Sequence, residues 1–124
     1  MPDIWKYDVF KLADRPVLEV YRLTSHFPDD ERFGLTAQTR RAAYSIPMNL
    51  VEGTSRGSTK EFNRFVLMAN GSCDEVRYQL HLASQLGYID RSTGHELTQE
   101  YEKVRMMLTK LSASLRRPAS PTDS

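Results

Sequence analysis

The stretch RAAYSIPMNLVEG, residues 41–53, decides the fold because it carries apolar residues at helical spacing on both sides of a proline. A proline inside a helix removes one backbone hydrogen bond, and its ring crowds the carbonyl four residues back, at a cost of about 3 kcal/mol. Either a helix ends here, or one helix continues and its surroundings tolerate the break. Ala43, Ile46 and Leu50 share one face across the proline. We therefore predict a single helix that bends at Pro47.

We expect this helix to cover about residues 36–52, with a cap at Thr36 and a stop at Gly53. Its core face consists of Ala42, Ala43, Ile46 and Leu50. A second set of apolar residues lies largely on the opposite side, namely Ala37, Tyr44, Pro47, Met48 and Val51. A helix that is apolar on two sides is usually covered on both.

The outer face of this helix therefore predicts contact with another subunit. Met68 and Leu82, which lie off the core stripe of the following helix, strengthen this prediction. The candidate interface comprises Tyr44, Met48, Val51, Met68 and Leu82. The alternative is a scatter of surface apolar residues, which monomeric proteins commonly have.

A polar stripe runs between these two faces and consists of Gln38, Arg41, Ser45, Asn49 and Glu52. Ser45 and Asn49 flank the proline, and short polar side chains bond backbone groups that a bent helix frees. A carboxylate in the last turn, such as Glu52, faces the negative end of the helix dipole and needs a nearby cation. The candidate cations are Arg41, Arg56, Lys60 and Arg64. For Glu52, a structural role in an ion-pair network is favoured over a catalytic role, and both alternatives stay open.

Three further segments show helical spacing of apolar residues, at about residues 10–26, 59–86 and 93–116. The segment at 59–86 has the clearest ends, because STKE at 58–61 is a capping box and Gly87 supplies a left-handed closing residue. Its core stripe is Phe62, Phe65, Val66, Ala69, Cys73, Val76, Leu80 and Ala83. The first helix places Phe10, Ala13, Val17, Val20, Tyr21 and Thr24 on one face, and the last places Leu97, Tyr101, Val104, Leu108, Leu111 and Leu115.

Four such helices joined by short connections predict an all-α fold, an antiparallel up-down four-helix bundle over residues 1–117. The remaining residues, 118–124, have no apolar periodicity and predict a disordered tail. Pro16 leaves two alternatives for the first helix: it is the first residue of a shorter helix, or it marks a kink in a longer one. Cys73 falls inside a core stripe, which favours a buried apolar role over a reactive thiol.

Length and charge exclude several classes of protein. With 124 residues the chain fits one small domain, and 17 Lys and Arg against 16 Asp and Glu exclude a strongly basic nucleic-acid coat or a polybasic membrane anchor. A single cysteine forms no internal disulfide. The sequence shows neither a secretory leader nor an apolar run near 18 residues, so we expect a cytoplasmic protein without membrane association.

No arrangement of residues predicts catalysis. His26, His81 and His95 lack metal-ligand spacing. The segment EGTSRG at 52–57 lacks the spacing of a phosphate-binding loop, and no serine or cysteine has a recognisable base partner. We therefore expect a non-enzymatic protein without a cofactor or metal. Motif spacing does not detect a site whose residues come from different helices of the bundle.

Cations gather around the second helix and the start of the third. The candidate nucleic-acid-binding residues are Arg40, Arg41, Arg56, Lys60 and Arg64, with Arg32 nearby. Five acidic residues interleave with these six cations and leave one net positive charge. In a ring of subunits the same residues add their fields and attract phosphate backbones. The alternative, a solvated mixed-charge surface, is equally consistent with the sequence.

Several motifs of this region occur in the order of a known family. They are VYRLTSHFP at 20–28, ERFGLTAQTRRAA at 31–43, SIPMNLVEG at 45–53, KEFNRF at 60–65, ANGS at 69–72 and LGY at 86–88. Over about two thirds of the chain, the sequence resembles the bacterial four-helix-bundle proteins encoded in intervening sequences of 23S ribosomal RNA genes. It departs from that pattern at Pro16 and at Phe10, where the family often has Trp.

The resemblance implies a four-helix bundle that assembles into a ring-like homopentamer. It does not imply membership of the ribosome, and one related branch comprises accessory proteins of diversity-generating retroelements, which look like nucleic-acid-binding partners of a reverse transcriptase. Arg40, Arg41, Glu52 and Arg64 match the family's motif, which leaves open whether they bind RNA or lock the fold.

The first functional hypothesis is therefore a non-enzymatic, oligomeric bundle that binds structured RNA or DNA through summed basic surfaces. The second is a protein-binding scaffold without nucleic-acid binding. A third, less favoured, is a bundle that binds a small molecule or a metal ion.

Overall fold

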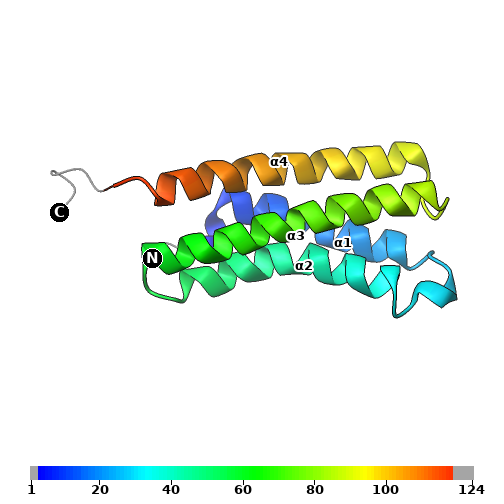
Figure 1. The fold of residues 1–124 in the computed structure, drawn as a ribbon, viewed down its shortest axis with the longest axis horizontal. Helices are drawn as coiled ribbons and strands as arrows, with labels where there is room; N and C mark the ends of the chain where they lie inside the picture. The colour runs from blue at the N-terminus through cyan, green and yellow to red at the C-terminus, as the bar shows by residue number, and fades with distance from the viewer. Residues whose placement is uncertain (1–2, 119–124) are drawn as a thin grey trace.

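The computed structural model describes residues 3–118, and these form an all-helical bundle (Figure 1). Two short 3-10 helices, η1 (Ile4–Lys6) and η2 (Asp29–Glu31), accompany four α-helices, which are α1 (Asp8–Thr24), α2 (Leu35–Thr54), α3 (Thr59–Gln85) and α4 (Arg91–Leu115). The predicted all-α four-helix bundle is confirmed. The tail predicted at 118–124 lies outside the described residues, apart from Pro118.

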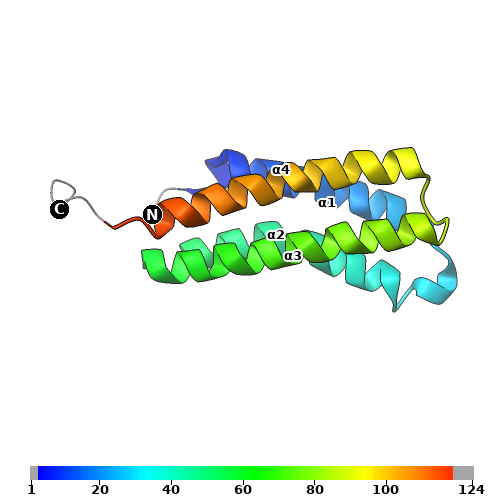
Figure 2. The ribbon, with the colours of Figure 1, turned by 45° about the horizontal axis from the view of Figure 1, so that its top comes forward.

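The four helices run alternately up and down along one long axis (Figures 1 and 2). The connection between α2 and α3 lies at the same end as the last turn of α4, whereas the α1–α2 and α3–α4 connections lie at the opposite end. Each pair of consecutive helices is therefore antiparallel, and α4 returns beside α1. Short connections between long amphipathic helices produce this order, because the apolar stripe of each helix packs against that of the helix next to it in the sequence.

The core contains the stripes that the sequence predicts. All eight predicted core residues of α3 and all four of α2 are buried, as are Leu97, Tyr101, Val104 and Leu108 of α4. Two placements are corrected. Tyr21 was expected in the core but is 41% exposed, because the Arg40 side chain, and not the core, lies against its ring. Pro47 was expected on the outer face but is buried.

Both prolines lie inside continuous helices. α1 begins at Asp8 and passes through Pro16, so Pro16 does not start the helix. α2 likewise continues through Pro47, which rules out a helix that ends there. Whether α2 is bent at this point stays a prediction.

The side chains beside Pro47 form hydrogen bonds with the backbone, as expected. They do not reach the carbonyl that lacks a hydrogen-bond donor because proline has no N–H. The Ser45 hydroxyl donates to the Ala42 carbonyl at 2.9 Å, and the Asn49 amide donates to the Ser45 carbonyl at 2.7 Å. Both bonds follow the ordinary reach of such side chains to carbonyls three or four residues back. The carbonyl that loses its partner belongs to Ala43, which lies between the two acceptors, one residue after Ala42 and two residues before Ser45.

The predicted cap of α2 is wrong. Thr36 lies inside the helix, whose first residue is Leu35. The Leu35 N–H donates instead to the Glu31 carboxylate at 3.1 Å. A longer side chain from η2 reaches this free amide, so a short hydroxyl at the helix start is not needed.

The predicted stop of α2 is also wrong, because the helix includes Gly53 and ends at Thr54. The left-handed residue is Gly57, with φ of 81°. Gly53 is instead a point of close approach between α2 and α3, since a Cβ there would lie 2.8 Å from the Phe65 Cβ. Of the capping box predicted for α3, one half is confirmed: the Ser58 hydroxyl accepts the Glu61 N–H at 3.1 Å, whereas the Glu61 carboxylate pairs with Arg64. The closing residue is confirmed too, since Gly87 has φ of 78°.

Candidate interaction surfaces

Arg40, one of the candidate nucleic-acid-binding residues, is held by contacts within the chain. Its guanidinium donates to the Thr24 hydroxyl at 2.7 Å and to the Tyr21 carbonyl at 3.2 Å, and it lies 4.7 Å from the centre of the Tyr21 ring. The Tyr21 carbonyl also accepts the Ser25 N–H at 3.1 Å, so Arg40 adds a further bond in the last turn of α1, where a cation is favoured by the helix dipole. Arg40 therefore joins α1 to α2.

Arg56 and Arg64 flank one aromatic ring at the other end of α2. Their guanidinium carbons lie 5.0 Å and 4.7 Å from the centre of the Phe65 ring. Arg56 pairs with Glu52. The Arg56 guanidinium is therefore the cation that the Glu52 carboxylate, in the last turn of α2, was expected to need. Arg64 pairs with Glu61, and this hydrogen bond lowers the pKa of the Glu61 carboxyl below its ordinary value.

Lys60 is exposed in the first turn of α3 and completes a basic cluster at the α2–α3 connection, which we call the turn cluster: Arg56, Lys60 and Arg64. Glu52 and Glu61 reduce its net charge to one positive unit. Arg41 lies about four helical turns from Arg56 along α2, on the exposed surface. The structure thus divides the five candidates into the turn cluster, the separate Arg41, and Arg40 with its role in the fold.

The outer face of α2 forms a ridge between two hollows. Tyr44 and Met48 border both of them. The α1–α2 hollow, of about 360 Å³, is lined by Trp5, Phe10, Asp14, Val17, Tyr44, Pro47, Met48 and Val51. The α2–α3 hollow, of about 720 Å³, has a more polar lining, which includes Arg41 and Glu75 beside the apolar Met68.

The structure brings four of the five candidate interface residues onto this ridge and its two hollows, namely Tyr44, Met48, Val51 and Met68. Leu82 does not join them, because it lies about four helical turns beyond Met68 along α3. Sequence reasoning missed Trp5, which is 59% exposed and packs edge-on against Phe10 with 4.8 Å between ring centres. The sequence did contain a signal for this residue, because the only tryptophan of the chain lies close to a tyrosine in IWKY at 4–7.

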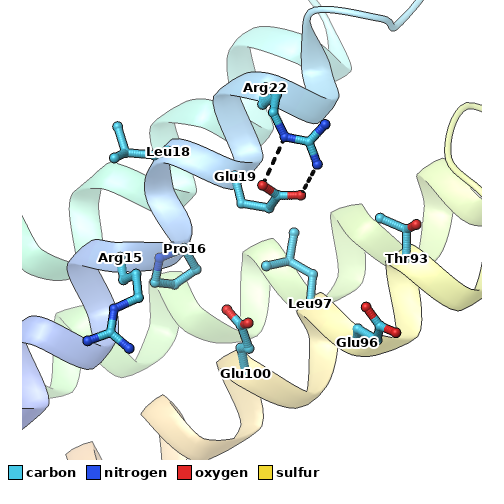
Figure 3. Close-up of a pocket in the computed structure, with 9 residues that line it drawn as sticks. All are labelled: Arg15, Pro16, Leu18, Glu19, Arg22, Thr93, Glu96, Leu97 and Glu100. Carbon is cyan, nitrogen blue, oxygen red and sulfur yellow. Dashed lines mark hydrogen bonds and ion pairs between the residues drawn. The ribbon is translucent and has the colours of Figure 1, made fainter.

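A further hollow, of about 360 Å³, lies between α1 and α4 (Figure 3). Figure 3 shows the Glu19–Arg22 pair on α1 facing the α4 side chains, with Pro16 and Leu97 between the helices. Its walls carry two guanidinium groups and three carboxylates, in Arg15, Arg22, Glu19, Glu96 and Glu100. This mixture of opposite charges favours neither an anion nor a cation.

Cys73 has the environment of a structural residue. It is buried, and its thiol donates to the Tyr101 carbonyl at 3.1 Å. Burial raises the pKa of the thiol to about 12, so the nucleophilic thiolate is scarce at neutral pH. The predicted core placement of Cys73 is confirmed.

Among residues 3–118, no group of three or more His, Cys, Asp or Glu side chains is arranged to hold a metal ion. Within the same range, no helix combines the length and apolar character needed to cross a bilayer.

The fold and these surfaces define a four-helix-bundle protein with an apolar ridge on its second helix. The sequence profile of the 23S rRNA-intervening sequence protein family matches residues 6–110. The chain therefore belongs to that family, and the predicted resemblance is confirmed.

A solved structure supports the fold independently. The chain is similar to a protein with unknown function from the S23 ribosomal protein family of Bacteroides thetaiotaomicron, with a TM-score of 0.77 and 19% sequence identity. The similarity covers 84% of this chain and 97% of that protein. No curated protein matches the sequence.

Proposed function

We propose that this chain is a non-enzymatic, homo-oligomeric bundle protein that binds RNA or DNA. The observation that carries the proposal is the apolar ridge on α2, where Met48 is 55% exposed beside the exposed Trp5. Apolar groups of this size that converge on one face mark interaction sites in soluble proteins. The family resemblance supports a pentamer as the oligomeric state.

The shape of the ridge favours a head-to-tail contact. Tyr44 and Met48 project between two unlike hollows, one mainly apolar and one more polar. A two-fold dimer requires a patch that complements itself, whereas a ring requires a ridge on one subunit and a complementary surface elsewhere on the next. The asymmetric surroundings of the ridge fit the second arrangement.

Light scattering at micromolar concentration tests the oligomer. We expect an oligomeric mass for the wild type and a monomeric mass for Met48→Glu, because the new carboxylate loses its hydration in the interface. Met106→Glu is the matched control, since Met106 is 52% exposed on α4 and borders neither hollow of the ridge. A monomeric wild type, or the same dissociation in both variants, would contradict the proposed interface.

Nucleic-acid binding is proposed for the turn cluster and Arg41. Each subunit offers only a small net positive charge there, so affinity depends on repetition of the cluster around a ring. Such binding weakens steeply with salt, because each neutralised phosphate releases counterions. Arg40 is left out of this proposal, since its contacts with Thr24 and Tyr21 occupy it.

Fluorescence anisotropy with a labelled structured RNA, at 50 and 200 mM salt, measures this binding. We expect the double variant Arg41→Ala and Lys60→Ala to bind more weakly and with a shallower salt dependence than the wild type. Neither residue makes an ion pair within residues 3–118, so the fold should be preserved. Lys110→Ala on α4 serves as the control. Absence of binding at low salt would remove the nucleic acid from the proposal.

A protein-binding scaffold is the second candidate. The pairing of Arg56 with Glu52 and of Arg64 with Glu61 favours it, because paired guanidinium groups attract phosphates less strongly. An intact oligomer without affinity for RNA or DNA would support this candidate. Recovery of a specific protein partner after nuclease treatment would complete the case.

A further inference from the structure

A hollow of about 280 Å³ lies between the last turns of α3 and the first turns of α4. The polar residues that line it are His81, Ser84, Gln85, Arg91, His95 and Thr98. His81 and His95 are far apart in the sequence and were expected to be unrelated surface residues. The antiparallel packing of α3 and α4 brings both to the same hollow.

The side chains around the α3–α4 hollow share one chemistry. Arg91 is a permanent cation, and two imidazoles become cations when they bind a proton. Two hydroxyls and one amide add neutral donors. Among residues 3–118, no carboxylate lines this hollow, whereas Glu75 lines the α2–α3 hollow and three carboxylates line the α1–α4 hollow.

A close helix contact forms part of this hollow. Gly94 is buried, and a Cβ at this position would lie 2.5 Å from the Ser84 hydroxyl oxygen and 3.1 Å from the Ile89 Cδ1. The absence of a side chain at Gly94 therefore lets α4 approach α3 closely beside the Ser84 hydroxyl. His81 and His95 lie one turn before Ser84 and one residue after Gly94, respectively.

Titratable residues close in sequence to those of the hollow contact other groups or border another hollow. Asp90 accepts the Thr93 N–H at 2.7 Å and the Thr93 hydroxyl at 2.9 Å, and these bonds lower the pKa of its carboxyl. Glu96 borders the α1–α4 hollow. On α3, Arg77 pairs with Glu102, and the Tyr78 ring lies 6.1 Å from the His81 ring.

We propose that the α3–α4 hollow binds a tetrahedral oxyanion, with a phosphoryl group as its biological ligand. Arg91 supplies a permanent positive charge, and the imidazole, hydroxyl and amide groups donate hydrogen bonds to the oxygens of the anion. A divalent cation fits less well, because Arg91 repels it and, within the described part of the chain, no carboxylate or thiolate joins the two imidazoles. The inference does not rest on the proposed oligomer or on the turn cluster.

Sulfate is the primary probe, because its charge stays constant between pH 5.5 and pH 8. Titration followed by NMR should shift the imidazole signals of His81 and His95 and leave those of His26, which lies at the end of α1, unchanged. The titration is carried out with chloride used to hold ionic strength constant, so that a shift reports sulfate and not general screening. Equal shifts at all three histidines, or no shift at His81 and His95, would overturn the proposal.

Variants separate the site from a general charge effect. The double variant His81→Gln and His95→Gln should bind sulfate more weakly than the wild type, and Arg91→Gln should weaken binding at both pH 5.5 and pH 8. His26→Gln is the control and should behave as the wild type. All four positions are exposed, so the variants should fold, which circular dichroism verifies. Wild-type sulfate binding in the double variant at pH 5.5 would overturn the assignment.

A second titration distinguishes the sources of the phosphoryl group. Inorganic phosphate is compared with a short RNA that carries a 5′-phosphate and with the same RNA without it. Shifts at His81 and His95 with inorganic phosphate alone support a free small anion, and shifts that require the 5′-phosphate support an RNA end. Shifts with neither phosphate-bearing probe would overturn a phosphoryl ligand.

Discussion

Gly53 shows at the scale of one residue how a helix interior can require glycine. A glycine in mid-helix ordinarily costs about 1 kcal/mol relative to alanine. Here the cost is offset by close packing, since an added Cβ would lie 2.8 Å from the Phe65 Cβ and 3.0 Å from the Phe62 Cδ1. The Phe65 Cβ is fixed to its backbone, so relief requires movement of a whole helix.

We expect Gly53→Ala to lower the free energy of unfolding by about 1–2 kcal/mol, because overpacking outweighs the gain in helix propensity. Urea denaturation measures the change. Gly71→Ala is the matched control: Gly71 is also helical, but nothing lies within 4 Å of an added Cβ. The control should be stabilised by about 0.4–1 kcal/mol, and a stabilised Gly53→Ala would contradict the close approach.

Cys73 should be unreactive in the folded protein. With a pKa of about 12, about one ten-thousandth of the thiol is ionised at pH 8, and the side chain is fully buried. We expect labelling by a thiol reagent at pH 8 to be at least about 100-fold slower than in guanidinium chloride. Equal rates in the two conditions would show that Cys73 is accessible.

At the scale of elements, one carboxylate connects three parts of the chain. The two oxygens of Glu31 in η2 accept the Leu35 N–H at the start of α2 and the Tyr88 hydroxyl, at 2.9 Å, from the α3–α4 connection. The hydrogen bond to Glu31 raises the pKa of Tyr88. The Tyr88 ring also packs against Phe27, with 5.3 Å between ring centres. Glu31 therefore links η2, the start of α2 and the α3–α4 connection at this end of the bundle.

We expect Glu31→Ala to lower the free energy of unfolding by about 1 kcal/mol, the usual effect of removing a helix cap. Hydrogen exchange of the Leu35 amide should become faster, because that N–H loses its acceptor. Tyr88→Phe is the control that removes only the other hydrogen bond and should leave the exchange of Leu35 unchanged. Unchanged exchange in Glu31→Ala would refute the cap.

For the whole molecule, burial predicts the response to alkaline pH. Burial raises the pKa of Cys73 to about 12 and also raises that of Tyr101. Both groups are neutral when protonated, so between the ordinary pKa values and the raised ones the folded state binds more protons than the unfolded state. Stability is then complete below about pH 9 and falls as pH rises.

We expect Cys73 alone to account for a loss of about 2 kcal/mol between pH 8 and pH 10.5. Urea denaturation at both pH values measures it, with Cys73→Ala as the comparison. The variant is less stable at pH 8 because of its cavity, but its stability should fall less on going to pH 10.5. Parallel losses in both proteins would show that Cys73 does not contribute.

Much of the fold could be predicted because it depends on local periodicity. The stripes of α2 and α3 are buried as predicted, and Ser58 and Gly87 act as predicted because caps involve neighbours in sequence. Predictions failed where a distant group competed. Glu31, and not Thr36, accepts the N–H at the start of α2. Gly53 packs closely against Phe65 and does not end the helix, and Tyr21 lies against Arg40 outside the core.

The candidate surfaces divide in the same way. The spacing of Tyr44 and Met48 placed both on one exposed face of α2, which a single helix is enough to establish. The role of Arg40 depends on its contacts with the end of α1. The partner of Glu52 comes from the connection after α2, and the hollow shared by His81 and His95 requires two packed helices. Trp5 was missed because it lies before the first regular helix.

The sequence by itself determined that the chain is a four-helix bundle, since helical periodicity, glycine and proline positions and chain length are local properties. Tertiary structure alone decided which polar residues hold the fold and which remain free to bind. Side chains such as those of Arg40 and Arg41 are adjacent and chemically identical, yet one is bound to α1 and the other lies at the surface. Their difference arises from what the neighbouring helix places beside them, which no pattern within one helix contains.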